Sequence, residues 1–244
     1  MEKIFQLGAD IAKLWEKYAS SYFSGMYSTI TLALLCTLVG CLIGLLCGIL
    51  QTIPSSKNDN IIKRAVLFVI RAFVRLYVEV FRGTPMMLQI MILYLCGPIF
   101  TRALFGFVYT PNPFIVGTIA VSINSGAYTT ELFRSAIQSI DKGQWEAAQT
   151  IGLDYFQTMR YVILPQSLKR ILPPFVNEFI VLIKDSSLLS TIGAVELLQT
   201  ATVIGGQYYN YLIPLSLATV MYLVMTLTIS HFARKLERRL AESD

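Results

Sequence analysis

Residues 25–53 read GMYSTITLALLCTLVGCLIGLLCGILQTI, a run of 29 residues without a single charged side chain. About 20 consecutive apolar residues cross the hydrocarbon core of a bilayer as an α-helix, so this stretch is long enough to span a membrane. Gly40, Gly44 and Gly48 recur at every fourth position, and such a ridge of small residues lets a second helix approach closely. We therefore predict a first membrane span over residues 25–53, closed by Pro54 and carrying a glycine packing ridge.

The rest of the chain has the same character. Of its 244 residues, 55% are hydrophobic and 14% charged, whereas about a quarter of a typical soluble domain is charged. A soluble protein with a large helical core would need polar faces on most helices, and the long uncharged stretches of this chain lack such faces. We expect an all-α membrane protein with five transmembrane helices. The four further spans are predicted at residues 85–105, 114–133, 173–189 and 211–232.

The segments outside the spans are predicted as follows. Residues 1–24 mix charges and apolar side chains and lack the compact apolar stretch and cleavage site of a signal peptide, so we expect an amphipathic helix lying on the membrane. Residues 61–82 form a second amphipathic segment, with charged groups on one helical face that suit the headgroup region. Those groups are Arg71, Arg75, Glu79 and Arg82. Residues 134–170 are too charged to span and form a loop, and residues 233–244 form a tail.

The distribution of lysine and arginine predicts the orientation. Cytoplasmic loops carry an excess of these residues. With the amino end outside, fifteen of them fall on the inner side and four on the outer side, while Lys184 lies within a span. The carboxyl end and the loop 134–170 are then cytoplasmic. The same excess accounts for the net charge of +5 without a nucleic-acid partner.

The loop 134–170 has its own predicted structure. Capping-box patterns begin at Asp141 and at Asp154, each with a glutamine three residues further on. Gly152 stands where the first helix needs a left-handed terminator. We therefore predict two short helices, hinged at Gly152 and ended by Pro165.

One side of the first loop helix is apolar, because Ala147, Ala148 and Ile151 share a face. In an aqueous loop this face would stay exposed unless something covered it. Two interpretations remain open from the residues alone. Either the helix docks a partner, or it lies back on its own membrane domain.

The same residues carry a family resemblance. Glu146-Ala147-Ala148, then Gly152, then Ile163-Leu164-Pro165 resemble the EAA loop of the permease subunits of ABC importers. Residues 29–232 resemble one branch, the polar amino-acid uptake permeases of the histidine, glutamate, glutamine, arginine and opine type. The patterns that carry this are YVEVFRGTP at 77–85, residues 128–134, Pro165-Gln166 and KDSSL at 184–188.

The resemblance implies a type I ABC importer permease fold in the cell (inner) membrane. It implies a second permease chain as homodimer or heterodimer, two ATP-binding cassette subunits that bind ATP and magnesium, and an extracytoplasmic solute-binding protein. In that family the loop helix inserts into a cleft of the ATP-binding subunit. The matching coupling residues here are Glu146, Ala147, Ala148, Ile151, Gly152, Leu153 and Pro165.

We expect neither an enzyme nor a cofactor-binding protein. The sequence has no phosphate-binding loop and no nucleophile–base constellation, so no catalytic residue is assigned. The four cysteines all fall within spans and lack metal-ligand spacing, so no metal site is assigned. Energy then comes from a partner ATPase. The alternative is an ion-gradient-driven secondary transporter or channel, which would need internal repeats or broken helices.

Charged residues inside spans are costly and mark candidate functional positions. Lys184 and Asp185 are adjacent and point about 100° apart on a helix, so at least one needs another partner. The third span adds polar groups at similar depth. The candidate substrate-pathway residues are Asn124, Ser125, Glu178, Lys184, Asp185 and Ser186. For each of them a structural role remains an alternative, and the sequence does not name the amino acid.

Overall fold

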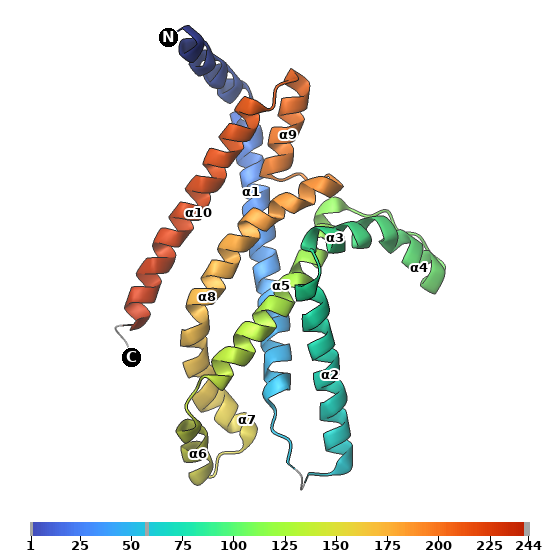
Figure 1. The fold of residues 1–244 in the computed structure, drawn as a ribbon, viewed down its shortest axis with the longest axis vertical. Coiled ribbons are helices and arrows are strands. Elements are labelled where there is room, and N and C mark those ends of the chain that lie inside the picture. The colour runs from blue at the N-terminus through green and yellow to red at the C-terminus, as the bar shows by residue number, and fades with distance from the viewer. Residues whose placement is uncertain (1, 57–58, 242–244) are drawn as a thin grey trace. The chain divides into compact units, whose positions relative to one another are not determined.

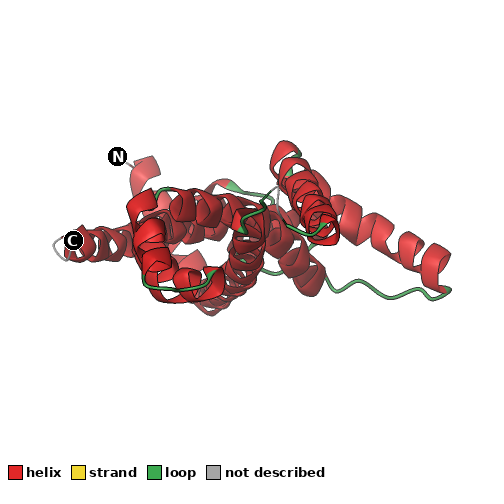
Figure 2. Cartoon of the chain, turned by 90° about the horizontal axis from the view of Figure 1, so that it is seen from below, coloured by secondary structure: helices red, strands yellow, loops and turns green. Residues whose placement is uncertain are grey.

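The computed structural model describes residues 2–56 and 59–241, and these consist of helices joined by loops, with no strand among them (Figures 1 and 2). The chain forms two compact units. The first contains Met1–Leu35, Met87–Ala120 and Phe179–His231, and the second contains Cys36–Met86, Val121–Glu178 and Phe232–Asp244. Four long helices contribute residues to both units: α1 (Glu2–Thr52), α5 (Pro113–Gln138), α8 (Leu164–Asp185) and α10 (Leu212–Ala241).

Helix α1 is continuous from Glu2 to Thr52, so the amino-terminal segment is not a separate helix as the sequence had indicated. No proline or turn sequence lies before Pro54, and a helix once formed extends residue by residue at low cost. Tyr22 is fully buried, and its hydroxyl donates a hydrogen bond of 3.0 Å to the carbonyl of Pro214. Packing against the start of α10 therefore begins before the predicted span.

Helix α2 (Ile61–Gly83) begins at Asn60, whose side chain accepts a hydrogen bond from the Ile62 amide. The predicted span 85–105 is a helix in three parts. These are α3 (Met86–Met91), a π-helical turn η1 (Ile92–Cys96) and α4 (Gly97–Phe105). Gly106 ends α4 in the left-handed conformation, with a φ of 75°.

The helix that contains the predicted span 173–189 begins well before Pro173. A continuous helical segment runs through α7 (Tyr155–Thr158), the π-helical turn η2 (Met159–Ile163), α8 and the 3₁₀ segment η3 (Ser186–Ile192). Pro165 directly follows the π-helical turn η2 inside this segment, so it does not end the loop helix as predicted. Pro173 and Pro174 lie inside α8, where proline removes hydrogen bonds without necessarily ending a helix.

The predicted connector between the last two spans contains another helix, α9 (Leu197–Tyr208). Its sequence, LLQTATVIGGQY, includes two adjacent glycines, which lower helix propensity and are more typical of a connector than of a helix. Helix α10 extends well beyond the predicted end at residue 232.

By length and composition, three helical stretches of the described chain are suited to cross a membrane: Gly8–Thr52, Met86–Phe105 and Leu212–Leu236. Tyr155–Ile192 and Leu197–Tyr208, bent by 46° at the break between them, are suited in length and composition to cross only when taken together, as a broken span or a re-entrant loop. Helix α5 is long enough but is not among them, because polar side chains reduce its hydropathy. Those that are buried are Ser122, Asn124, Ser125, Thr129 and Thr130.

In the second unit, the predicted glycine ridge of α1 is confirmed as a packing surface against α5. An added Cβ at Gly40 would lie 2.7 Å from the Ser125 hydroxyl oxygen, and one at Gly48 would lie 2.7 Å from the Phe133 Cβ. The Thr129 hydroxyl donates a 2.6 Å hydrogen bond to the Gly40 carbonyl. The facing pairs are Gly40 with Ser125, Gly44 with Thr129 and Gly48 with Phe133.

Candidate functional site

The loop 134–170 contains two short helices, α6 (Lys142–Thr150) and α7, as predicted (Figure 1). Asp154 forms the expected capping box: its carboxylate accepts from the Gln157 amide at 2.8 Å, and the Gln157 side chain accepts from the Asp154 amide at 3.0 Å. Asp141 caps α6 by accepting from the Gly143 amide at 2.7 Å. Its predicted reciprocal bond is absent, because the Gln144 side-chain oxygen accepts from Gln166 instead.

The predicted turn at Gly152 is confirmed. Its φ is 83°, in the left-handed region that side chains with a Cβ rarely adopt. The Leu153 amide donates to the Ala148 carbonyl at 3.1 Å, and the Gly152 amide donates to the Gln149 carbonyl at 3.0 Å. These two bonds define a Schellman motif, which satisfies the carbonyls at the end of α6.

One side of the loop is anchored to the helices of its own unit. Trp145 of α6 stacks on Tyr155 of α7, with ring centroids 5.8 Å apart, and the Tyr155 hydroxyl lies 3.2 Å from that of Thr52 at the end of α1. Beneath them lies a small core of buried side chains, Ile137, Ile140, Met159 and Ile163. The loop is therefore a packed element.

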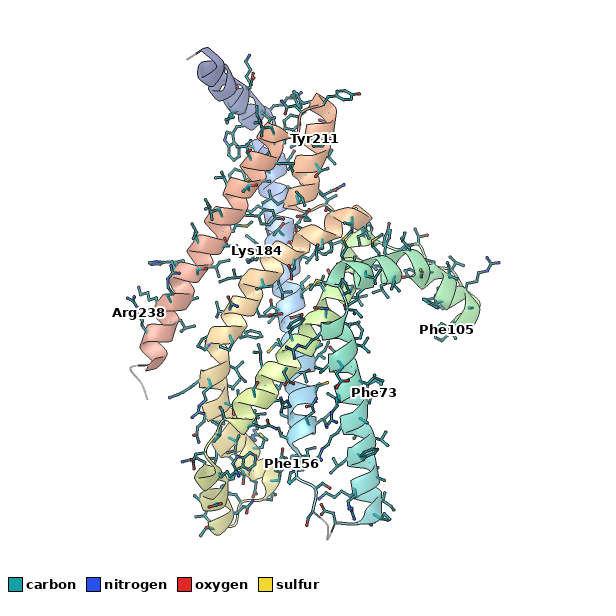
Figure 3. The ribbon with its side chains drawn as sticks, in the orientation of Figure 1. Phe73, Phe105, Phe156, Lys184, Tyr211 and Arg238 are labelled. Carbon is teal, nitrogen blue, oxygen red and sulfur yellow. The ribbon has the colours of Figure 1, made fainter. Side chains whose placement is uncertain are left out.

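The other side of the loop is exposed and apolar. Ile151 is 76% exposed, Phe156 70% and Tyr161 65%, and Figure 3 labels Phe156 on α7. Glu146 and Ala147 are also exposed. Ala148 is only 3% exposed, so its predicted place on the uncovered face is wrong. Its small side chain packs α6 against the unit beneath. The loop thus packs on its own unit with one side, as the second interpretation has it, and leaves its other side uncovered, so docking of a partner there stays a prediction.

The remaining predicted coupling residues lie at the edges of this surface. Gly152 and Pro165 are exposed, and Leu153 is half-buried. The sequence analysis missed Phe156 and Tyr161. Both residues follow the second capping box. They lie on a helix that continues through Pro165, whereas the sequence had indicated a short helix that ends at this proline.

Three predicted pathway residues, Asn124, Ser125 and Glu178, belong to the second unit. The buried Ser125 hydroxyl lies 3.4 Å from a carboxylate oxygen of the half-buried Glu178, so α5 and α8 bring these two together. The Asn124 side chain is buried, and its amide donates to the Phe81 carbonyl at 2.9 Å. That contact joins α5 to the last turn of α2.

The other three, Lys184, Asp185 and Ser186, belong to the first unit. Lys184 is exposed (Figure 3), Asp185 is half-buried, and the buried Ser186 hydroxyl donates to the Ile183 carbonyl at 2.7 Å. The ion pairs of the described residues, Lys63–Asp59 and Arg134–Glu131, include none of these three. The six candidates therefore fall into two groups in separate units.

A further buried group, Glu196, was not singled out from the sequence. Its carboxylate is fully buried and caps α9 by accepting from the amides of Leu198 at 2.8 Å and Gln199 at 2.6 Å. It also accepts from the Tyr222 hydroxyl of α10 at 2.6 Å. An acidic residue directly before an apolar run is a helix-start signal, and applying it at residue 196 would have indicated α9.

Long apolar helices joined to a packed helical loop define a membrane permease fold. A family model for the binding-protein-dependent transport system inner membrane component matches residues 61–242, and the chain belongs to this family. The chain is an amino-acid ABC transporter permease of the inner membrane. Members of this family are transport subunits and not catalytic enzymes. Among the described residues, no group of His, Cys, Asp or Glu side chains is arranged to hold a metal ion.

Relatives of known name fit this assignment. The chain is 38% identical over 174 residues to the putative glutamine transport system permease protein GlnP of Rickettsia bellii, covering 71% of this chain and 77% of the relative. It is 40% identical to the arginine transport system permease protein ArtQ of Bacillus subtilis, covering 69% and 74%. It is 41% identical to the glutamine transport system permease protein GlnP of Escherichia coli, covering 67% and 73%.

Solved structures share the fold. A crystal structure of an amino acid ABC transporter with histidines has a TM-score of 0.76 at 36% identity, covering 91% of this chain and 95% of that one. An inward-facing structure of the MetNI methionine ABC transporter has a TM-score of 0.73 at 22% identity, covering 92% and 98%. The second likeness concerns the fold alone.

Proposed function

We propose that this chain is the membrane-spanning subunit of an ATP-driven importer of a polar amino acid. It forms the translocation pathway with a second permease chain, as homodimer or heterodimer, and receives substrate from an extracytoplasmic solute-binding protein. Two ATP-binding cassette subunits bind ATP and magnesium and supply the energy. The names of the glutamine and arginine permeases, and of the amino acid transporter with histidines, support this substrate class.

The observation that carries the proposal is the two-sided loop. Its inner side is fixed by the Trp145–Tyr155 stack and by Ala148, whereas its outer side presents the apolar side chains of Ile151, Phe156 and Tyr161. An exposed apolar patch on an ordered element is typical of a protein–protein interaction site. Movement of a docked ATPase would pass through the packed side to α8, because α7, η2 and α8 form one helical segment.

The proposed coupling surface is formed by Glu146, Ala147, Ile151, Gly152, Leu153 and Pro165, with Phe156 and Tyr161 added to them. Ala148 is given an anchoring role in place of a contact role. We place this surface in the cytoplasm, with five spans and an external amino end, on the distribution of lysine and arginine. The third proposed span is α5, whose Asn124 amide donates to α2 and whose Thr129 hydroxyl donates to α1.

For the pathway, we assign the half-buried Glu178 a contact with the substrate, and the buried Ser125 hydroxyl beside it the role of positioning the carboxylate. A carboxylate beside a hydroxyl offers acceptor oxygens for an ammonium or amide group, which polar amino acids carry. A second polar group is also proposed to line the pathway. It consists of Lys184, Asp185 and Ser186. In contrast, Asn124 is assigned to helix packing through its bond to Phe81.

Co-purification with matched variants tests the coupling surface. Phe156→Ser combined with Ile151→Ser should lose the ATP-binding subunit, because the apolar patch is removed while the anchored side stays intact. Phe105→Ser is the control, since Phe105 is also 70% exposed but ends α4, away from the loop sequence (Figure 3). Retention of the ATPase by the double variant would contradict the proposal. Uptake by this chain alone in liposomes with an ion gradient would favour the secondary-transporter alternative.

A further inference from the structure

A cavity of about 730 Å³ lies along α2 in the second unit and reaches Ser55 in the chain segment after α1. Arg64, Phe68, Arg71 and Arg75 line it at spacings of four, three and four residues, so they share one face of α2. Two alanines on the same face leave the hollow open, because larger side chains there would fill it. These are Ala65 and Ala72.

The cavity is strongly basic. The ion pairs of the described chain, Lys63–Asp59 and Arg134–Glu131, leave its three arginines out. Asp59 lies near Arg64 but is engaged by the Ser56 amide and by Lys63, which lower its pKa. The Arg71 guanidinium donates to the Ile53 carbonyl, while its buried Nε lacks a hydrogen-bond partner among the described residues. The cavity therefore has donors and positive charge available for an anion.

The apolar side chains of α2 indicate the kind of anion that this cavity binds. Phe68 contributes an apolar wall to the cavity, and Val69, Phe73 and Leu76 are exposed further along the helix, Phe73 by 72% (Figure 3). Helix α2 runs along α1 and α5, to which the Arg71–Ile53 and Asn124–Phe81 hydrogen bonds join it. A basic pocket on the cytoplasmic side of such helices is typical of anionic lipid headgroups, whose acyl chains take the apolar contacts beside it. A free phosphate or a nucleotide would use only the first of these features.

We propose that this cavity binds the headgroup of an anionic phospholipid, with the phosphate held by Arg64, Arg71 and Arg75 and the acyl chains lying against Ile61 and Phe68, the exposed apolar side chains that line the same cavity. Guanidinium groups bind phosphate oxygens through two parallel hydrogen bonds, and three of them converge on one hollow. The site depends on α2 and the segment after α1 alone. It therefore does not rest on the proposed import function.

The test measures lipid binding to the purified transporter complex by native mass spectrometry and by titration with short-chain phosphatidylglycerol. We expect one saturable site per permease chain, with phosphatidylcholine binding much more weakly. Each basic residue near a membrane surface strengthens lipid binding roughly fivefold, so the triple variant Arg64→Gln, Arg71→Gln, Arg75→Gln should bind on the order of a hundredfold more weakly. The matched control removes three charges from α10 through Arg234→Gln, Lys235→Gln and Arg238→Gln, and should bind normally.

Ala72→Trp supplies a second test that keeps every charge and fills the hollow. It should abolish the saturable site, and it keeps the proposal testable if loss of the Arg71–Ile53 bond prevents folding of the triple variant. Equal losses in the α10 control would mean unspecific attraction and overturn the proposal. Competition by inorganic phosphate as strong as by the lipid would replace the lipid site with a free-phosphate site. No saturable binding by the complex would mean that another subunit covers this face, which also overturns it.

Discussion

The crossing of α1 and α5 at Gly44 allows one prediction to be worked out in detail. An added Cβ at Gly44 would lie 2.6 Å from the Thr129 Cβ and 2.7 Å from the Thr129 carbonyl carbon. Carbon atoms in good contact are about 3.5–4.0 Å apart, so Gly44→Ala must separate the helices by roughly 1 Å. A change of side-chain rotamer cannot relieve the contact, because one of the two atoms belongs to the α5 backbone.

The cost follows from three contributions. Overpacking of a tight core costs about 1–3 kcal/mol. Separation of the helices also weakens the 2.6 Å hydrogen bond from Thr129 to the Gly40 carbonyl, for which about 1 kcal/mol is typical. Alanine offsets about 1 kcal/mol through its higher helix propensity. The expected net destabilisation is about 1–3 kcal/mol, or roughly 2–12 °C in Tm for a chain of this size.

Thermal unfolding of the purified complex, followed by intrinsic fluorescence in one detergent, measures this shift. The control is Gly8→Ala in the same helix, because nothing lies within 4 Å of a Cβ added at Gly8. Its Tm should be unchanged or slightly raised. An unchanged Tm for Gly44→Ala, or an equal fall for Gly8→Ala, would refute the packing argument.

Four further predictions concern buried polar groups and the loop. Glu196→Ala leaves two amides of α9 and the Tyr222 hydroxyl without their acceptor, and should lower the free energy of unfolding by about 3 kcal/mol or more in denaturation experiments. Asp154→Ala should cost about 1 kcal/mol through loss of the cap, seen as a lower Tm. Gly152→Val should abolish uptake while the chain still inserts, because its φ of 83° excludes β-branched residues. Asp185→Asn should change substrate-dependent ATPase activity.

Each of these has a control and a contradicting outcome. Tyr222→Phe, which removes one of three donors, should cost less than Glu196→Ala, and an equal or larger cost would contradict the capping role. Asp154→Ser should retain the cap, so equal losses for serine and alanine would argue against it. Gly152→Asn should keep part of the uptake, because asparagine tolerates the left-handed region. Normal uptake by Gly152→Val, or unchanged kinetics for Asp185→Asn, would leave those residues with structural roles.

Local sequence signals were sufficient to predict features that depend on a few neighbouring residues. The glycine ridge of α1, the Gly152 turn and the Asp154 cap follow from residue type and spacing, and the structure has all three. Proline positions were misleading, because a helix tolerates Pro165, Pro173 and Pro174 when the surrounding turns supply the remaining hydrogen bonds.

Other features could not be predicted from local sequence, because they depend on contacts with distant parts of the chain. The start of helix α9 has a local signal in Glu196, but its support comes from distant helices: the Thr29 hydroxyl of α1 accepts from the Leu197 amide at 3.2 Å, and the Tyr222 hydroxyl of α10 donates to Glu196 at 2.6 Å. Propensity alone gives no sign of such support. Likewise, Ala147 and Ala148 are identical in type and adjacent, and only the packing of α6 decides that one is exposed and the other buried.

The separation of anchoring and exposed side chains in the loop also bears on how such transporters diversify. The residues that hold the loop in place, Trp145, Ala148 and Tyr155, differ from the exposed Ile151 and Phe156. Exchange of the exposed pair alters the surface offered to another subunit without repacking the interior. If the ATPase docks on this surface as proposed, a permease built in this way can acquire a different ATPase, or share one with other permeases, through a few surface substitutions.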